Sequence, residues 1–173
     1  MRLARADDAE AIRAIYNVEV TTSTNVFDLV PRTPDEQIAW LEARSGAHAV
    51  VVGVGDDDRV IAFGALSPYR PRPAYSTTVE DSVYVDRAEQ GRGVGKAVLG
   101  RLVELAAAHG FHSIIGRIGG HNEASVAIHR DCGFELVGVE REVGRKFGRW
   151  LDVVVMQRLL DERDRAAARS QAQ

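Results

Sequence analysis

The order of hydrophobic and polar positions divides the chain into helical and extended segments. Apolar residues spaced three or four positions apart predict helices at about 9–20, 34–45, 94–108 and 123–132. Runs of β-branched and apolar residues predict strands at 2–6, 48–54, 59–66, 77–86, 111–118, 134–143 and 150–159. The order β-α-α-β-β-β-α-β-α-β-β therefore predicts an α/β (α+β) chain with about seven strands and flanking helices.

The stretch 77–108 joins a strand, a glycine-rich turn and a helix. Glycines stand at 91, 93 and 95, with Arg92 and Lys96 beside them, and apolar positions repeat helically from Val94. A turn that opens a helix presents free backbone N–H groups at the positive end of the helix dipole, which suits phosphate oxygens. The spacing fits neither the Walker loop nor the dinucleotide fingerprint, because the glycines alternate.

Length and composition set the remaining bounds. At 173 residues we expect one domain, residues 1–160, with a core of its own. The net charge of −3 argues against a general nucleic-acid binder. One cysteine and five scattered histidines predict no disulfide and no metal site. The sequence lacks the apolar run of a signal peptide or a membrane span, so we expect a cytoplasmic protein. Residues 161–173 lack an apolar face and are expected to form a frayed or disordered tail.

Several separated motifs resemble a known family. The residues Gln90-Gly91-Arg92-Gly93-Val94-Gly95 match the Gln/Arg-x-x-Gly-x-Gly/Ala motif with which the Gcn5-related N-acetyltransferases (GNAT) hold the pyrophosphate of acetyl-CoA. The segments 67–75, 78–85, 121–129 and 138–152 resemble the phosphinothricin and methionine sulfoximine/sulfone acetyltransferases of that superfamily. The resemblance covers about residues 2–160. It implies the GNAT fold with a mixed central sheet, acetyl-CoA as co-substrate, and a homodimer.

Acetyl transfer to an amine needs a group that takes the ammonium proton, and Glu80 is our candidate base. It precedes the glycine turn and by parity shares a strand face with Ser82 and Tyr84. The resemblance implies the same role, since the family's glutamate at this place is taken as the base, directly or through water. Asp81 is the competing carboxylate on the opposite face, and a bulge would exchange the two. Without the family, a solvent-facing Glu80 is an equal alternative.

The helix at 123–132 holds the candidate proton donor. Many members of the superfamily place a tyrosine there to protonate the departing sulfur, and the matching residue here is His129. A histidine can donate a proton near pH 7, although a plain surface histidine is an equal alternative. Cys132 in the same helix is expected to pack as a small apolar residue, with a nucleophilic role as a minor hypothesis.

The resemblance also implies the cofactor contacts. A backbone N–H of Val83, Tyr84 or Val85 is expected to polarise the thioester oxygen. Asn122, which can also cap the helix after it, is expected to bond the pantetheine arm, with Asp131 nearby. The expected cofactor-binding residues are Val83, Tyr84, Val85, Gly91, Arg92, Gly93, Val94, Gly95, Lys96, Asn122 and Asp131.

The acceptor side is predicted from arginines on the loop 67–75, which three prolines stiffen. Guanidinium forks bind a carboxylate or a tetrahedral oxyanion with two hydrogen bonds, as an amino-acid analogue requires. The predicted substrate-binding residues are Arg70, Arg72, Pro73, Ala74 and Tyr75. The alternative is a surface loop whose arginines meet only water.

The sequence thus predicts an acetyl-CoA-dependent N-acetyltransferase acting on the α-amino group of a small amino-acid analogue. A peptide or protein N-terminal acetyltransferase and a non-catalytic acetyl-CoA-binding module are the alternatives. Two segments stay open. The loop from Thr21 to Phe27 is either a surface connection or a substrate-side lid. Arg145, Lys146 and Arg149 reach a neighbouring subunit or the cofactor's 3′-phosphate, or they lie on a solvated hairpin.

Overall fold

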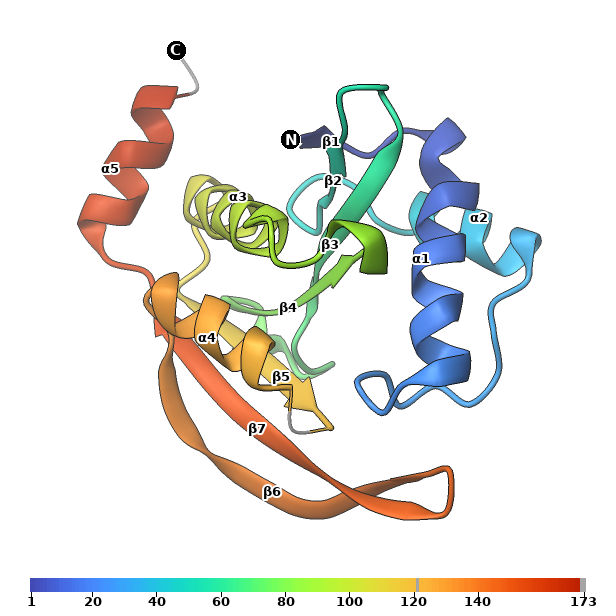
Figure 1. Ribbon diagram of the computed structural model, residues 1–173. Coiled ribbons are helices and arrows are strands. Elements are labelled where there is room, and N and C mark those ends of the chain that lie inside the picture. Colours follow the sequence, from blue (N-terminus) through green and yellow to red (C-terminus); the bar gives the residue numbers. More distant parts are fainter. Residues whose placement is uncertain (121, 172–173) are drawn as a thin grey trace.

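A seven-stranded mixed sheet forms the centre of the chain, with helices on both of its faces (Figure 1). The computed structural model describes residues 1–120 and 122–171, so His121 of the predicted turn lies outside the described part. The strands are β1 (Arg2–Leu3), β2 (Val50–Val54), β3 (Val60–Pro68), β4 (Thr78–Val85), β5 (Ser113–Gly119), β6 (Glu135–Lys146) and β7 (Arg149–Leu159). The helices are α1 (Ala9–Thr22), α2 (Pro34–Glu42), α3 (Val94–Ala108), α4 (Glu123–Asp131) and α5 (Glu162–Gln171). The predicted fold class is confirmed.

The sheet order is β1-β2-β3-β4-β5-β7-β6, and its central pair differs from the others. β4 and β5 run parallel, whereas every other neighbouring pair of these strands is antiparallel. The parallel pairing extends only from Thr78 to Asp81 on β4 and from Ser113 to Gly116 on β5. Both strands continue beyond that point, so their C-terminal ends separate in the middle of the sheet.

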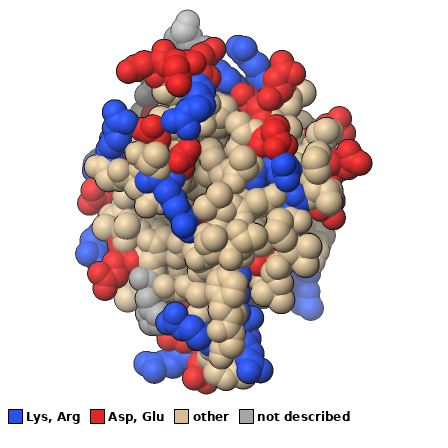
Figure 2. All heavy atoms as spheres, turned by 45° about the vertical axis from the view of Figure 1, so that its right-hand side comes forward, with Lys and Arg blue, Asp and Glu red and all other residues tan. Residues whose placement is uncertain are grey.

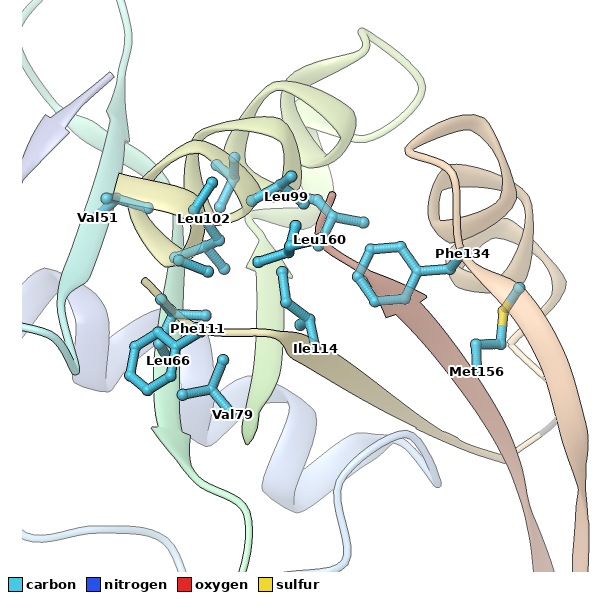
Figure 3. Close-up of a cluster of buried hydrophobic side chains, with 14 of the residues drawn as sticks. Val51, Leu66, Val79, Leu99, Leu102, Phe111, Ile114, Phe134, Met156 and Leu160 are labelled. Carbon is cyan, nitrogen blue, oxygen red and sulfur yellow. The ribbon is translucent and has the colours of Figure 1, made fainter. Parts of the chain in front are cut away.

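Side chains alternate between the two faces of the sheet and bury a cluster on each. On one face, α3 places Leu99 and Leu102 against Leu66, Val79 and Ile114 (Figure 3). The helix lies close to the sheet because β3 has a glycine there: a Cβ added at Gly64 would meet Val98 Cγ1 at 2.6 Å. On the other face, α1 and α2 cover a second cluster that includes Ile12, Tyr16, Val20, Val50, Val52, Phe63 and Ala65.

Two of the predicted helix starts have the hydrogen bonds of a cap. Thr33 Oγ1 accepts from the N–H of Glu36 at 3.2 Å, and the Glu36 carboxylate accepts from the N–H of Thr33 at 2.8 Å. Asn122 Oδ1 accepts from the N–H of Ser125 at 3.0 Å at the start of α4. Each side chain satisfies an N–H group that a helix start leaves free, so these local signals are sufficient to fix α2 and α4.

The structure differs from the prediction at the first strand and at the last hairpin. The first strand ends at Leu3, because Ala6–Asp8 form a 3-10 turn in which Asp8 pairs with Arg2 at 2.6 Å. The segment 144–149, predicted as a basic loop, instead extends both strands to a tight turn. Gly148 supplies the left-handed backbone of that turn, with φ at 74°.

The expected disordered tail contains the helix α5. Asp161 caps it, since its Oδ1 accepts from the N–H groups of Arg163 at 2.7 Å and Asp164 at 2.9 Å. The helix packs on α3 and buries Ala168 in the cluster beneath it. Ala168 is small, and the sequence of α5 shows no apolar stripe that would have predicted this contact.

The outer surface carries charges of both signs. On the face in Figure 2, basic and acidic side chains gather at the top and bottom, and uncharged residues dominate the centre. Among the helices of the described residues, none is long and apolar enough to cross a membrane.

Candidate functional site

The glycine turn before α3 has the backbone that its sequence predicts. Gly91 and Gly93 adopt left-handed φ values of 75° and 81°, and Gly93 is the N-cap of α3. The cap has no side-chain hydrogen bond, so the N–H groups of the first turn stay free for a ligand. Gly95 allows the start of α3 to lie close to β4 and α4, because a Cβ there would meet Val85 Cγ2 at 3.3 Å and Ile128 Cδ1 at 3.4 Å.

A cleft of about 600 Å³ opens between the separated ends of β4 and β5 and the N-terminus of α3. Its walls include Ile118 and Gly119 of β5 and Ile128 of α4. Every expected cofactor-binding residue except Arg92 lines it: Val83, Tyr84, Val85, Gly91, Gly93, Val94, Gly95, Lys96, Asn122 and Asp131. Because β4 and β5 do not pair with each other here, this stretch of β4 can offer backbone groups to a ligand.

Two ion pairs hold the basic residues of the turn. Arg92 pairs with Glu89, which lines the cleft, but Arg92 itself is not part of the cleft walls. Lys96 Nζ lies 2.9 Å from Asp131 Oδ2, and this hydrogen bond raises the pKa of Lys96. Asp131, expected beside the pantetheine arm, thus contacts Lys96 at the cleft.

Glu80 lies where the large cleft meets a second, smaller cavity, and it lines both. Burial raises the pKa of its carboxyl, and the positive charge of Arg117 offsets this only in part. Arg117 is itself held by Glu140 through two hydrogen bonds of 2.9 and 2.6 Å. A half-buried carboxylate with a raised pKa, facing two cavities, has the environment of a general base.

Asp81 points to the opposite face of β4, as a regular strand predicts, and meets His129 of α4. His129 Nε2 lies 3.1 Å from Asp81 Oδ2, and Nδ1 lies 2.7 Å from the carbonyl oxygen of Ser125. The ring packs on β5 where Gly116 has no side chain, since a Cβ there would meet His129 Cδ2 at 2.7 Å. The alternative of a surface histidine is wrong, because His129 is 3% exposed.

Both ring nitrogens of His129 face oxygen acceptors, which favours the doubly protonated ring. Burial alone would lower the pKa of His129, but the hydrogen bond and charge of Asp81 outweigh it and raise the pKa above its ordinary value. The other carboxylate oxygen, Asp81 Oδ1, is buried without a hydrogen-bond partner among the described residues. In the sequence, Asp81 is the alternative to Glu80 as the catalytic base. In the structure, Asp81 pairs with His129.

Cys132 lies at the end of α4 and does not line the two cavities. Burial raises the pKa of its thiol, which disfavours the thiolate that a nucleophile requires. Its surroundings therefore fit the expected packing role.

The smaller cavity, of about 150 Å³, lies on the α1–α2 side of Glu80 and contains residues that the sequence analysis missed. Arg32 and Arg44 line it with the aromatic rings of Tyr16 and Trp40. These residues come from separate segments of the chain, so no single sequence motif predicts them. The one local signal is the spacing of Trp40 and Arg44, four positions apart, which lets a guanidinium stack on a ring.

The predicted substrate-binding residues of the loop 67–75 lie outside the walls of both cavities, and only Ser67 of that loop lines the smaller one. Pro73, Ala74 and Tyr75 form a short 3-10 turn, and Arg70 and Arg72 are exposed. Arg70 stacks over Tyr69 at 5.0 Å and over Tyr75 at 5.8 Å. The positive charge of Arg70 acts on Glu80 and on Glu140, so this loop lies beside the base without closing its pocket.

The segment after α1 forms a wall of the site. Asn25 lines the large cleft, and Phe27 packs over the hairpin, where a Cβ at Gly144 would meet its ring at 2.2 Å. Lys146 is buried and donates to the carbonyl oxygen of Val26 at 2.7 Å. Lys146 thus holds the loop in place, while Arg145 stacks over Trp150 and Arg149 is exposed.

Comparison with known proteins places this geometry in a family. The family model described as an acetyltransferase (GNAT) domain matches residues 1–155. The L-methionine sulfoximine/L-methionine sulfone acetyltransferase of Pseudomonas paraeruginosa is 36% identical over 162 residues, which cover 93% of this chain and 94% of that protein. The phosphinothricin N-acetyltransferase of Streptomyces coelicolor is 37% identical over 157 residues, which cover 89% and 92%.

A solved structure extends the likeness to the fold. The GNAT superfamily phosphinothricin acetyltransferase of Sinorhizobium meliloti, in complex with AcCoA, matches with a TM-score of 0.90 and 38% identity over 93% of this chain and 88% of that one. A family model that spans most of the chain and relatives above 30% identity agree with the cleft at α3. The chain therefore belongs to the GNAT family of acetyltransferases, as the motifs of its sequence predicted.

Proposed function

We propose that this acetyltransferase uses acetyl-CoA to acetylate the α-amino group of a small amino-acid analogue such as phosphinothricin, methionine sulfoximine or methionine sulfone. The observation that carries the proposal is the position of Glu80, which faces a long cleft on one side and a small cavity on the other. Relatives named for these acceptors at 36–37% identity support the substrate class.

The residues of the large cleft fit acetyl-CoA. The free N–H groups at Gly91, Gly93 and Gly95 suit a pyrophosphate, and Lys96 adds positive charge. The end of β4, which pairs with β3 but not with β5, and Asn122 suit the amide groups of a pantetheine arm. When bound, acetyl-CoA supplies the acetyl group as a thioester.

The chain's own residues divide the remaining work. Glu80 takes the proton of the acceptor ammonium, directly or through water. A backbone N–H of Val83, Tyr84 or Val85 donates to the oxygen that becomes negative. His129 holds the proton that the departing thiolate needs, and Asp81 keeps the ring protonated and oriented. The pair thus acts as a unit behind the cleft.

Arg70, Arg72 and Tyr75 bind the α-carboxylate of the acceptor in this proposal. All three are exposed, and the positive charge of Arg70 acts on Glu80. A cavity of about 150 Å³ suits a small acceptor rather than a peptide, which disfavours an N-terminal acetyltransferase of proteins. The raised pKa of Glu80 favours an enzyme over a module that only binds acetyl-CoA.

A thiol-release assay tests the proposal. Acetyl-CoA is offered with phosphinothricin, methionine sulfoximine, methionine sulfone, common amino acids and a short peptide. We expect saturable release of CoA with at least one of the three analogues and little with the peptide. Release with the peptide alone, or with none of the acceptors, contradicts it.

The exposed apolar side chains of the β6–β7 hairpin support a homodimer. β6 is the edge strand of the sheet, and Leu136, Val137, Val139, Phe147 and Trp150 are exposed along the hairpin. A second copy of the chain would cover this apolar face. Light scattering should give twice the chain mass of 18.9 kDa, and Leu136→Lys should lower the measured mass; a monomer of wild-type protein contradicts the assembly.

We place the enzyme in the cytoplasm, which supplies acetyl-CoA and suits the free thiol of Cys132.

A further inference from the structure

We propose that the small cavity is an anion-binding subsite in which Arg32 and Arg44 hold a second oxyanion of the acceptor, a phosphinate or carboxylate on its side chain. The inference rests on the proposed function and narrows its substrate class. It assigns the preferred acceptor two negative groups: an α-carboxylate that stays outside the small cavity and a side-chain oxyanion that lies in it.

The first support is a pair of guanidinium groups that line the cavity without an ion-pair partner in the described part of the chain. Arg32 and Arg44 both line the cavity, and neither forms an ion pair with a carboxylate of the described residues. Asp28, on the same side of the sheet, accepts from the hydroxyl of Tyr16. Asp81, also on the wall, is paired with His129. Glu80, the other acid on the wall, faces the acceptor ammonium in the proposed function. Two half-buried guanidinium groups with no ion-pair partner among the residues described are then left to hold an anion.

The second support is an unsatisfied donor. Nε of Arg44 is buried and has no hydrogen-bond partner among the described residues. Burial lowers the pKa of Arg44, and the positive charge of Arg32 lowers it further. Buried donors are rarely left unpaired in native proteins, so this one calls for an acceptor that the chain does not supply. A phosphinate or carboxylate oxygen provides both the acceptor and the missing charge.

The third support is the rigidity of the two side chains. The Arg44 guanidinium carbon lies 3.9 Å from the centre of the Trp40 ring, and that of Arg32 lies 4.8 Å from it and 3.8 Å from Tyr16. Arg44 also donates to the carbonyl oxygen of Trp40 at 2.9 Å, and Arg32 donates to Gln37 Oε1 at 3.2 Å. Both groups are therefore held before a ligand arrives, which lowers the entropic cost of binding.

The position of Glu80 fixes the orientation of the acceptor. Glu80 lines the same cavity as the two arginines, so an ammonium at Glu80 and an oxyanion at Arg44 can belong to one small molecule. Among acceptors of this size, phosphinothricin carries a negative phosphinate, whereas the sulfone of methionine sulfone is neutral. The subsite therefore favours phosphinothricin and acidic amino acids over methionine sulfone.

The test compares two acceptors across matched variants. We measure kcat/KM for phosphinothricin and for methionine sulfone with the wild type, Arg44→Gln, Arg32→Gln and, as control, Arg101→Gln on the far face. Arg101 pairs with Glu104 on α3, and its replacement by glutamine removes the same positive charge. In the first two variants we expect phosphinothricin to lose about tenfold more activity than methionine sulfone. A ratio of the two losses that stays within about threefold overturns the subsite.

A binding measurement separates this inference from the proposed function. Both guanidinium groups contact the Trp40 ring, at 4.8 and 3.9 Å from its centre, and Trp150→Phe removes the other tryptophan. We expect phosphinothricin to change Trp40 fluorescence with saturation, at a concentration about tenfold lower than methionine sulfone. If the Trp150→Phe protein binds phosphinothricin in this way but neither it nor the wild type releases CoA, the proposed function is contradicted and the subsite is supported. Turnover of phosphinothricin with neither a fluorescence change nor a selective loss in Arg44→Gln overturns the subsite alone.

Discussion

The two cavities beside Glu80 present different chemical groups to their ligands: backbone groups in one and side chains in the other. The large cleft offers backbone groups to a ligand at the glycine turn, at the first turn of α3 and along the part of β4 that does not pair with β5. The small cavity is made of side chains, with Arg32 and Arg44 stacked on Trp40. Backbone groups bind the same ligand whatever side chains surround them, whereas single substitutions change a site made of side chains. Most side-chain substitutions should therefore leave the binding of acetyl-CoA unchanged, whereas substitutions in the small cavity should change which acceptor binds.

Glu80→Gln should have the largest effect, because Glu80 serves both cavities. The amide keeps the shape but cannot take a proton, so kcat should fall by about 10²–10⁴-fold. Calorimetry should find acetyl-CoA binding retained. Glu104→Gln on the outer face of α3 is the control and should keep wild-type turnover. Normal turnover in Glu80→Gln removes this residue from the mechanism.

Gly93→Ala should damage the cofactor side alone. Gly93 has φ at 81°, where any other residue is strained by about 1–3 kcal/mol. We expect the Kd for acetyl-CoA to rise about tenfold or more, with a smaller change in the acceptor KM.

Gly100→Ala is the matched control for that change. Gly100 lies inside α3 with nothing within 4 Å of an added Cβ, so the substitution should leave the Kd unchanged. It should raise the thermal midpoint slightly, since alanine favours a helix. Equal weakening of acetyl-CoA binding by both substitutions contradicts the role given to the turn.

Arg72→Ala should affect the acceptor side without selecting between acceptors. Every proposed acceptor has an α-carboxylate, so its KM should rise by about tenfold for phosphinothricin and for methionine sulfone alike. The KM for acetyl-CoA should stay near the wild-type value. Steady-state kinetics with both acceptors measures this, and an unchanged acceptor KM excludes Arg72 from binding.

Asp81→Asn should have the smallest effect, and one that depends on pH. Asp81 raises the pKa of His129, so the pair stabilises the fold fully below about pH 6.5 and less as pH rises through the raised pKa. The gap in thermal midpoint between wild type and variant should therefore be widest near pH 6. It should narrow by about 2–4 °C toward pH 9, the shift that 1 kcal/mol produces at this size. A gap that is constant or widens with pH contradicts the pairing.

The same variant separates orientation from stability. If Asp81 keeps His129 protonated, the alkaline limb of the pH–rate profile should move to lower pH in Asp81→Asn. A merely structural role would lower stability and leave that limb in place.

The sequence predicted the cofactor side well because its signals are contiguous. The strand, the glycine turn and α3 lie within 77–108, and parity alone placed Glu80 and Asp81 on opposite faces. The partner of Asp81 could not be predicted, since His129 lies 48 positions away and meets it only through the packing of α4 on β5. Arg32 and Arg44 were missed for the same reason. Helix α5 was missed because its sequence has no apolar stripe, and Ala168, which it buries, is a small residue.

The central claim is that Glu80 stands between the coenzyme and the amine. A crystal structure of the enzyme with CoA and phosphinothricin tests it most directly. We predict CoA in the cleft of β4 and α3, the amine nitrogen within about 3 Å of Glu80 or one water away, and the phosphinate at Arg32 and Arg44. An amine that points away from Glu80, or CoA bound elsewhere than at the glycine turn, would contradict the claim.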